Sequence, residues 1–152
     1  MSEHRVTVSW DRGDTDFTYE TYGRDHTWTF EGGSTIAASA APSYQGNADL
    51  VDPEEAFVAS LSSCHMLTLL ALAAKKQLTV ERYTDRAIGF LEKNDEGMLA
   101  ITRVVLRPEI QFGGERQPSP AELAAIHEKA HRHCFIANSV KTEVTIEQAA
   151  AV

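Results

Sequence analysis

The sequence predicts a single α+β domain, in which a mainly antiparallel sheet packs on a long central helix and a second helix. A continuous apolar segment from Asp52 to Leu78 is too long for a strand, and a second capped helical segment begins near Ser119. Short segments of alternating apolar and polar residues flank both helices, so the order is strands, helix, hairpin, helix, strand. At 152 residues, the chain fits one domain spanning residues 1–152.

The N-terminal third contains short strand and turn signals. RVTVSW alternates apolar and polar residues, and FTYETY is rich in β-branched and aromatic residues, so these two segments predict an N-terminal hairpin. A turn at residues 23–26 leads into the strand TWTF, and the turn EGGS leads into TIAASA. We expect the Gly-, Pro- and Asn-containing segment at residues 42–50 to form a loop.

The central helix has a clear start. Asp52 is a favourable N-cap, Pro53 suits the first helical position, and Glu55 completes a capping box. No residue between Ala56 and Ala74 carries a formal charge, and apolar side chains occur all round the helical wheel, which predicts burial on every side. About 19 uncharged residues also reach the minimum length of a membrane span. The serines, histidine and threonine within this segment favour a core helix instead.

The C-terminal half predicts a hairpin, a helix and a strand. TVERYTDRAIGFLEK and MLAITRVVLRPEIQF read as two long strands joined by a turn at Asn94–Gly97. Ser119 and Glu122 form the capping box of a second helix that we expect to run to about Ile136. Asn138 suits a left-handed residue after that helix, and SVKTEVTIE follows as an alternating strand.

Charge and N-terminal composition limit the function classes. The chain has 14 basic and 22 acidic residues, and its net charge of −8 disfavours nucleic-acid binding. The first ten residues lack the features of a secretory signal, so we expect a cytoplasmic protein. Because cytoplasmic thiols are kept reduced, Cys64 and Cys134 are expected to serve redox chemistry, metal binding or packing rather than a permanent disulfide.

The two cysteines are the strongest chemical candidates. Cys64 lies among polar residues in the otherwise apolar helix, and a reactive thiolate there would need a nearby arginine or histidine. Cys134 shares a helical face with His127 and Ala130, so it is expected to point to the core and could reach Cys64. Packing is the alternative for both cysteines, since free Cys is often buried.

Zinc binding is a rival from another functional class. His127, His131 and Cys134 follow one another at i, i+4 and i+7 and are acceptable zinc ligands. Their spacing matches no common zinc signature, and two helical turns separate His127 from Cys134 by about 10 Å. Phosphate-loop, nucleophile-elbow and HExxH motifs do not occur in the sequence.

Four segments together carry a family resemblance. They are VDPEEAFVASLSSCHMLTLLALAAKK, DRAIGFLEK, ITRVVLRPEIQF and AHRHCFIANSVK. They resemble the OsmC/Ohr family of osmotically induced and organic hydroperoxide resistance proteins, from about Tyr22 to Glu147. The Pro53-Glu54 pair, separated from Cys64 by nine residues, is the most specific element, and Cys64-His65 is more similar to the OsmC branch. The segment after Cys134 lacks the proline associated with Ohr proteins.

The resemblance implies a thiol peroxidase that reduces organic hydroperoxides, built as an intertwined homodimer with active sites at the subunit interface. By this analogy Cys64 attacks the peroxide, Cys134 resolves the sulfenic acid, and Arg24 and Glu54 activate the thiolate, with Arg24 preferred to Arg12. No cofactor, nucleic acid or membrane is expected, and the reductant would be a dithiol such as a dihydrolipoyl protein. The alternatives are the zinc protein and a non-catalytic stress protein that binds apolar ligands.

The positions of Glu54 and Cys64 pose a geometric problem. They are ten residues apart in the predicted helix, which separates them by about 15 Å and rotates them about 80° from a common face. One arginine cannot easily contact both. The sequence therefore predicts either a break in the helix or a two-fold antiparallel helix crossing near Ala59, through which Glu54 of one subunit serves Cys64 of the other.

Overall fold

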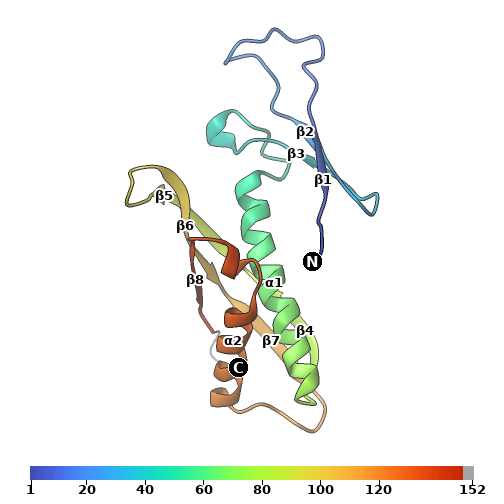
Figure 1. Cartoon of the computed structure of the whole chain (residues 1–152), viewed down its shortest axis with the longest axis vertical. Helices are drawn as coiled ribbons and strands as arrows, with labels where there is room; N and C mark the ends of the chain where they lie inside the picture. The colour runs from blue at the N-terminus through green and yellow to red at the C-terminus, as the bar shows by residue number, and fades with distance from the viewer. Residues whose placement is uncertain (149–152) are drawn as a thin grey trace. The chain divides into compact units, whose positions relative to one another are not determined.

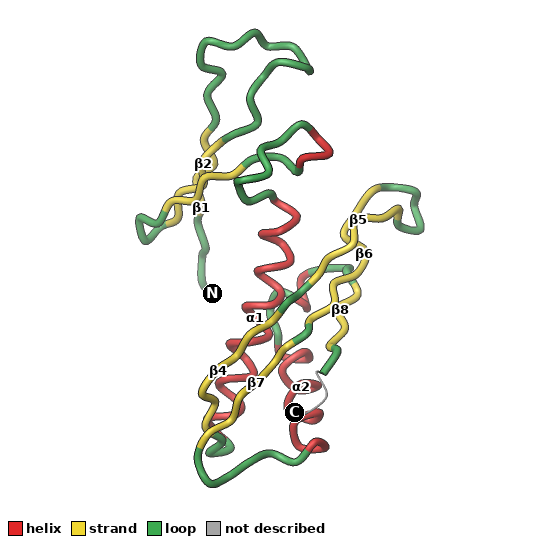
Figure 2. Tube along the Cα trace, turned by 180° about the vertical axis from the view of Figure 1, so that it is seen from behind, coloured by secondary structure: helices red, strands yellow, loops and turns green. Residues whose placement is uncertain are grey.

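The computed structural model describes residues 1–148 and confirms the α+β class (Figures 1 and 2). The chain divides into two compact units, Met1–Ala56 and a second unit that starts at Phe57. Helix α1 begins in the first unit and continues into the second. The elements in chain order are β1 (Val6–Ser9), β2 (His26–Phe30), β3 (Thr35–Ala38), η1 (Pro42–Tyr44), α1 (Pro53–Lys75), β4 (Thr79–Asp85), β5 (Ile88–Lys93), β6 (Leu99–Leu106), β7 (Pro108–Gly113), α2 (Pro120–His133), η2 (Ala137–Ser139) and β8 (Glu143–Ile146).

The first unit contains an antiparallel sheet in the order β1-β2-β3. The prediction that FTYETY pairs with RVTVSW is wrong, because β1 pairs with β2 instead. Residues 17–22 form turns, in which the Thr21 hydroxyl donates to the Asp16 carbonyl at 2.8 Å and accepts from the Thr18 N–H at 3.3 Å. These local side-chain bonds compete with pairing in a sheet.

Helix α1 begins where the sequence predicts. The Glu55 N–H donates to the Asp52 carboxylate at 2.8 Å, and the Asp52 N–H donates to the Glu55 carboxylate at 3.2 Å, which completes the capping box. The helix ends at Lys75, three residues before the predicted end. Gln77 has a left-handed φ of 59°, and the Leu78 N–H bonds to the Ala73 carbonyl at 3.0 Å in a Schellman arrangement.

Within residues 1–148, only one face of α1 is buried. Leu61, His65, Leu69 and Ala73 recur every four residues along that face, whereas Leu67 on another face is 60% exposed. The prediction of burial on every side is therefore wrong for the single chain, since the strands of the second unit and α2 cover one stripe. By length and composition alone, α1 could also cross a membrane, with 22% of the tested window buried.

The second unit contains a long hairpin that changes sheets midway. Strand β4 pairs with β7, and β5 pairs with β6, both antiparallel, while β8 is parallel to β6. Each predicted long strand is thus divided in two, as the tube trace shows (Figure 2). At the division, between β6 and β7, the Arg107 N–H donates to the Asp85 carboxylate at 2.6 Å. A side chain thus takes the place of a neighbouring strand as the acceptor for this backbone N–H.

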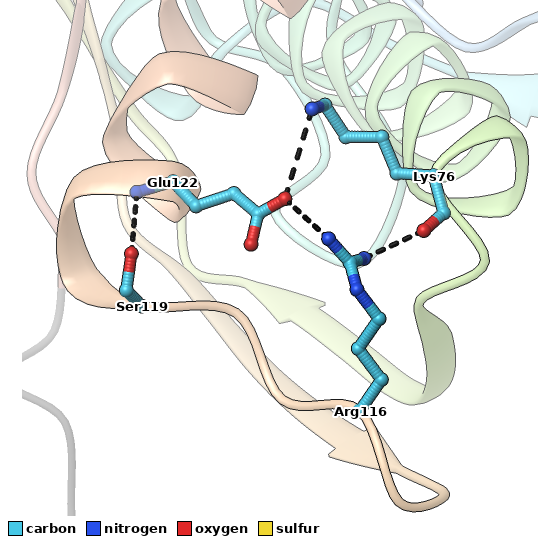
Figure 3. Close-up of polar contacts among 4 residues, drawn as sticks. All are labelled: Lys76, Arg116, Ser119 and Glu122. Atoms are coloured by element: carbon cyan, nitrogen blue, oxygen red, sulfur yellow. Dashed lines mark hydrogen bonds and ion pairs between the residues drawn. The ribbon is translucent and has the colours of Figure 1, made fainter.

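Helix α2 starts at its predicted cap but ends early. The Ser119 hydroxyl accepts from the Glu122 N–H at 3.1 Å, and the Glu122 carboxylate pairs with Arg116 at 2.9 Å and with Lys76 at 3.6 Å (Figure 3). The helix ends at His133 rather than Ile136. Cys134 is extended, and the segment that follows forms the tight η2 turn instead of a cap with a left-handed Asn138.

Two apolar clusters hold the second unit together. Leu69, Ala73, Leu78, Ile126 and Ala130 join α1 to α2, while Leu61, Val104 and Leu106 join α1 to β6. Gly89 on β5 lies directly against α1, because a Cβ atom there would stand 2.5 Å from a Val58 methyl group. These contacts position the middle of α1, which carries Cys64.

Candidate active site

The structure brings the two cysteines together. Cys64 lies in the middle of α1 and is partly exposed, whereas Cys134 follows the last residue of α2 and is 1% exposed. Both are free thiols, and the Cys64 side chain lies near enough to Cys134 to raise the pKa of Cys134. A partly exposed thiol beside a buried one allows an external molecule to react first with Cys64 and the product to meet Cys134.

Cys134 is held as a protonated thiol. The pKa of Cys134 is raised to about 11, mainly by burial and then by the neighbouring Cys64 side chain, while the backbone N–H groups of Ala137 and Ile136 partly oppose the rise. The Ala137 N–H donates to the Cys134 sulfur at 3.4 Å. The segment after α2 therefore orients the Cys134 thiol, although no sequence signal identified this role.

A part-buried hydrogen bond joins α1 to β4 near Cys64. The Ser62 hydroxyl donates to the Asp85 carboxylate of β4 at 2.5 Å. Other hydroxyls nearby bond within the helix, as the Thr68 hydroxyl does when it donates to the Cys64 carbonyl at 2.9 Å. Asp85 was not singled out from the sequence, because its partner lies 23 residues away.

Two buried histidines lie in the same two segments as the cysteines, His65 next to Cys64 and His127 seven residues before Cys134. His65 and His127 are 1% and 3% exposed, and His65 Nε2 lies 3.0 Å from His127 Nδ1. Their rings are parallel within 4° with centroids 5.3 Å apart. Burial is the main cause that lowers the pKa of His65 to about 4, with the charges of His127 and His131 adding to the effect. Burial also lowers the pKa of His127, against the opposing charge of Asp85.

The zinc alternative finds no geometric support. Within residues 1–148, no group of three or more His, Cys, Asp or Glu side chains could hold a metal ion. His127 faces His65 instead of forming a set with His131 and Cys134. Spacing along the helix suggested that set, but the extended backbone at Cys134 takes this residue out of the helical pattern.

Arg24 belongs to the first unit and is held within its own loop. Its guanidinium donates to the Tyr22 carbonyl at 2.5 Å and to the Tyr19 carbonyl at 2.6 Å. It also lies over the Tyr22 ring, 3.7 Å from the centroid, in a cation–π contact. Arg12, the other arginine considered, donates to the Thr15 carbonyl at 3.3 Å.

Glu54 lies in the first turn of α1. Because α1 runs without interruption from Pro53 to Lys75, the predicted alternative of a helix break is wrong. The regular rise of a helix then separates Glu54 from Cys64 of the same chain by about 15 Å. The second alternative, in which Glu54 serves Cys64 of another copy, stays a prediction.

A family model describes most of this chain. The model for OsmC-like protein matches residues 46–149, which include α1, the hairpin and α2 with both cysteines. The chain belongs to the OsmC-like protein family. The resemblance seen in the sequence to OsmC/Ohr proteins is thus confirmed.

Solved structures share the fold of this OsmC-like protein along nearly its whole length. An OsmC-like protein of unknown function from Vibrio cholerae is 51% identical, with a TM-score of 0.95 over 98% of this chain and 100% of the other. An organic hydroperoxide resistance protein OsmC from Legionella pneumophila is 16% identical, with a TM-score of 0.72 over 100% and 98%. An organic hydroperoxide resistance protein from Elizabethkingia anophelis is 18% identical, with a TM-score of 0.71 over 98% of each chain.

Proposed function

We propose that this protein is a two-cysteine thiol peroxidase that reduces organic hydroperoxides to alcohols. The observation that carries the proposal is the partly exposed thiol of Cys64 beside the buried, protonated thiol of Cys134. The organic hydroperoxide resistance proteins that share this fold support a role in peroxide stress. We place the reaction in the cytoplasm, where dithiol reductants are available.

The proposed reaction has three steps. The Cys64 thiolate attacks the hydroperoxide ROOH and takes one oxygen, so that with one proton it yields the alcohol ROH and the sulfenic acid of Cys64. The Cys134 thiol then condenses with the sulfenic acid, which forms the Cys64–Cys134 disulfide and releases water. A dithiol, such as a dihydrolipoyl protein, reduces this disulfide to two thiols and is itself oxidised to a disulfide.

We further propose a homodimer as the active form. Apolar side chains on the exposed faces of α1, such as Leu67 at 60% exposure, favour a second copy as the cover for that helix. Arg24 would stabilise the Cys64 thiolate after exchanging its backbone carbonyl partners, and Glu54 of the second copy would orient Arg24 through a charge-assisted bond. Apolar groups at Phe57, Met66 and Leu67 would favour bulky organic peroxides.

The test is consumption of cumene hydroperoxide with dihydrolipoamide as reductant. The wild type is expected to turn over, Cys64→Ser to be inactive, and Cys134→Ser to consume one equivalent of peroxide per chain without further turnover. Circular dichroism of both variants controls for folding. Full activity of Cys64→Ser would show that the mechanism is wrong. Absence of turnover by the wild type with any dithiol would favour the apolar-ligand alternative, and one zinc per purified chain would favour the metal alternative.

A further inference from the structure

The buried histidine pair and the cysteine pair connect the same two segments of the chain. His65 directly follows Cys64 in α1, and His127 precedes Cys134 by seven residues, which is about two helical turns. The His65–His127 hydrogen bond is 3.0 Å long, and both side chains are almost fully buried. Any rotation of α1 that moves His65 away from His127 therefore also moves Cys64.

Packing alone does not explain two histidines at these positions. An apolar pair of similar size would fill the same space without the cost of burying polar nitrogen atoms. Here His65 Nδ1 is buried with no hydrogen-bond partner within residues 1–148, so the pair retains part of that cost. What the histidines add is direction, because a hydrogen bond between two neutral rings requires one donor nitrogen aligned with one acceptor nitrogen.

A second directional contact restrains the same helical turn. Ser62 bonds to Asp85 two residues before Cys64, and His65 bonds to His127 one residue after it. The apolar contacts of Leu61 and Leu69 hold α1 in place but are not directional, so they define its rotation less closely. The two polar contacts thus bracket Cys64.

We propose that His65 and His127 are positioning residues, whose hydrogen bond sets the rotation of α1 so that Cys64 and Cys134 meet in the geometry that disulfide formation needs. This inference rests on the thiol pair of the proposed function and does not depend on which peroxide, if any, oxidises it. It predicts a stronger tendency of the two cysteines to form a disulfide than the same cysteines have without the histidine bond.

The test is a redox equilibrium in glutathione buffers at pH 7.5, followed by acid quenching and mass spectrometry. The reaction is protein dithiol plus glutathione disulfide going to protein disulfide plus two glutathione thiols, and its equilibrium constant gives the effective concentration of one cysteine at the other. His127→Leu and His65→Leu remove the bond and are expected to lower this effective concentration by about fivefold to tenfold, as the loss of one buried hydrogen bond implies.

Conservative variants separate direction from packing. The amide of His127→Asn can replace Nδ1, and the amide of His65→Gln can replace Nε2. The effective concentration of both variants is therefore expected to stay within about twofold of the wild-type value. His133→Leu, an exposed position on the same helix, is the matched control and is expected to have no effect. The double variant His65→Phe with His127→Phe keeps two flat rings without the hydrogen bond. Its effective concentration is expected to decrease as much as that of the leucine variants.

Two results with the variants would overturn the inference. One is that folded leucine or double-phenylalanine variants have the same effective concentration as the wild type. The other is an equal loss in the amide variants, which would mean that side-chain shape alone matters. A wild type that forms the disulfide readily in glutathione but shows no peroxide turnover would refute the proposed function and leave this inference intact. Failure of the wild type to form the intramolecular disulfide would refute the inference.

Discussion

The Ser62 hydroxyl donates to the Asp85 carboxylate at 2.5 Å and thereby joins the middle of α1 to the end of β4. The same carboxylate accepts the Arg107 N–H at 2.6 Å, where the hairpin passes from β6 to β7. One side chain therefore connects the helix that carries Cys64 to both strands of the hairpin.

Replacing Asp85 is expected to destabilise the protein. Asp85→Ala removes the acceptor of two hydrogen bonds, one of them part-buried, and should lower the free energy of unfolding by about 2–3 kcal/mol. Ser62→Ala should cost about 1 kcal/mol, because the carboxylate keeps the Arg107 bond. Urea denaturation measures both changes. Asp95→Ala, in the exposed hairpin turn, is the control, and an equal effect there would contradict the assigned role of Asp85.

Acid is expected to weaken the fold through the histidine pair. The pKa of His65 is lowered from 6.5 to about 4, so between these pH values the unfolded chain binds protons that the folded chain does not. The contribution of His65 to the free energy of unfolding is therefore fully present above about pH 6.5 and decreases as the pH falls toward 4. The decrease is at most about 1.4 kcal/mol per pH unit for each proton bound on unfolding. Urea denaturation as a function of pH measures this slope. It should become shallower in the double variant His65→Phe with His127→Phe, and an unchanged slope would contradict the prediction.

Glycine at the end of α1 is expected to stabilise the protein. Gln77 adopts a left-handed φ of 59°, which a side chain with a Cβ disfavours. Gln77→Gly should raise the free energy of unfolding by about 0.5–1 kcal/mol, because relief of strain exceeds the added entropy of the unfolded chain. Thermal melting measures the effect, with Lys75→Gly inside the helix as a control that should destabilise. A lower melting temperature for Gln77→Gly would contradict the expected strain.

The proposed homodimer should depend on the exposed side of α1. Leu67→Glu places a charge at a position that is 60% exposed in the single chain, so the monomer should fold normally while the dimer weakens by at least about tenfold. Sedimentation equilibrium measures the association. Met98→Glu, at 64% exposure in the hairpin, is the matched control. Equal association of the Leu67→Glu protein and the wild type would exclude this surface of α1 from the interface.

Local signals predicted the starts of both helices correctly. Asp52 with Glu55 and Ser119 with Glu122 act across three residues, so the chain needs no tertiary contact to begin a helix there. Helix ends were less predictable. The α2 helix stops at His133 because Cys134 is extended and η2 follows, although no glycine or proline marks that end in the sequence.

The sequence by itself determined the α+β class, the starts of the helices and the two cysteines as chemical candidates, since these follow from local composition and spacing. The resemblance of four segments to known proteins indicated the family. The tertiary structure alone decided that His65 meets His127 across 62 residues and that Ser62 meets Asp85 across 23. It also decided that the two long strands divide between sheets and that a single chain buries one face of α1. Such contacts depend on how remote segments pack, because hydrogen bonding between distant side chains leaves no periodic pattern along the chain.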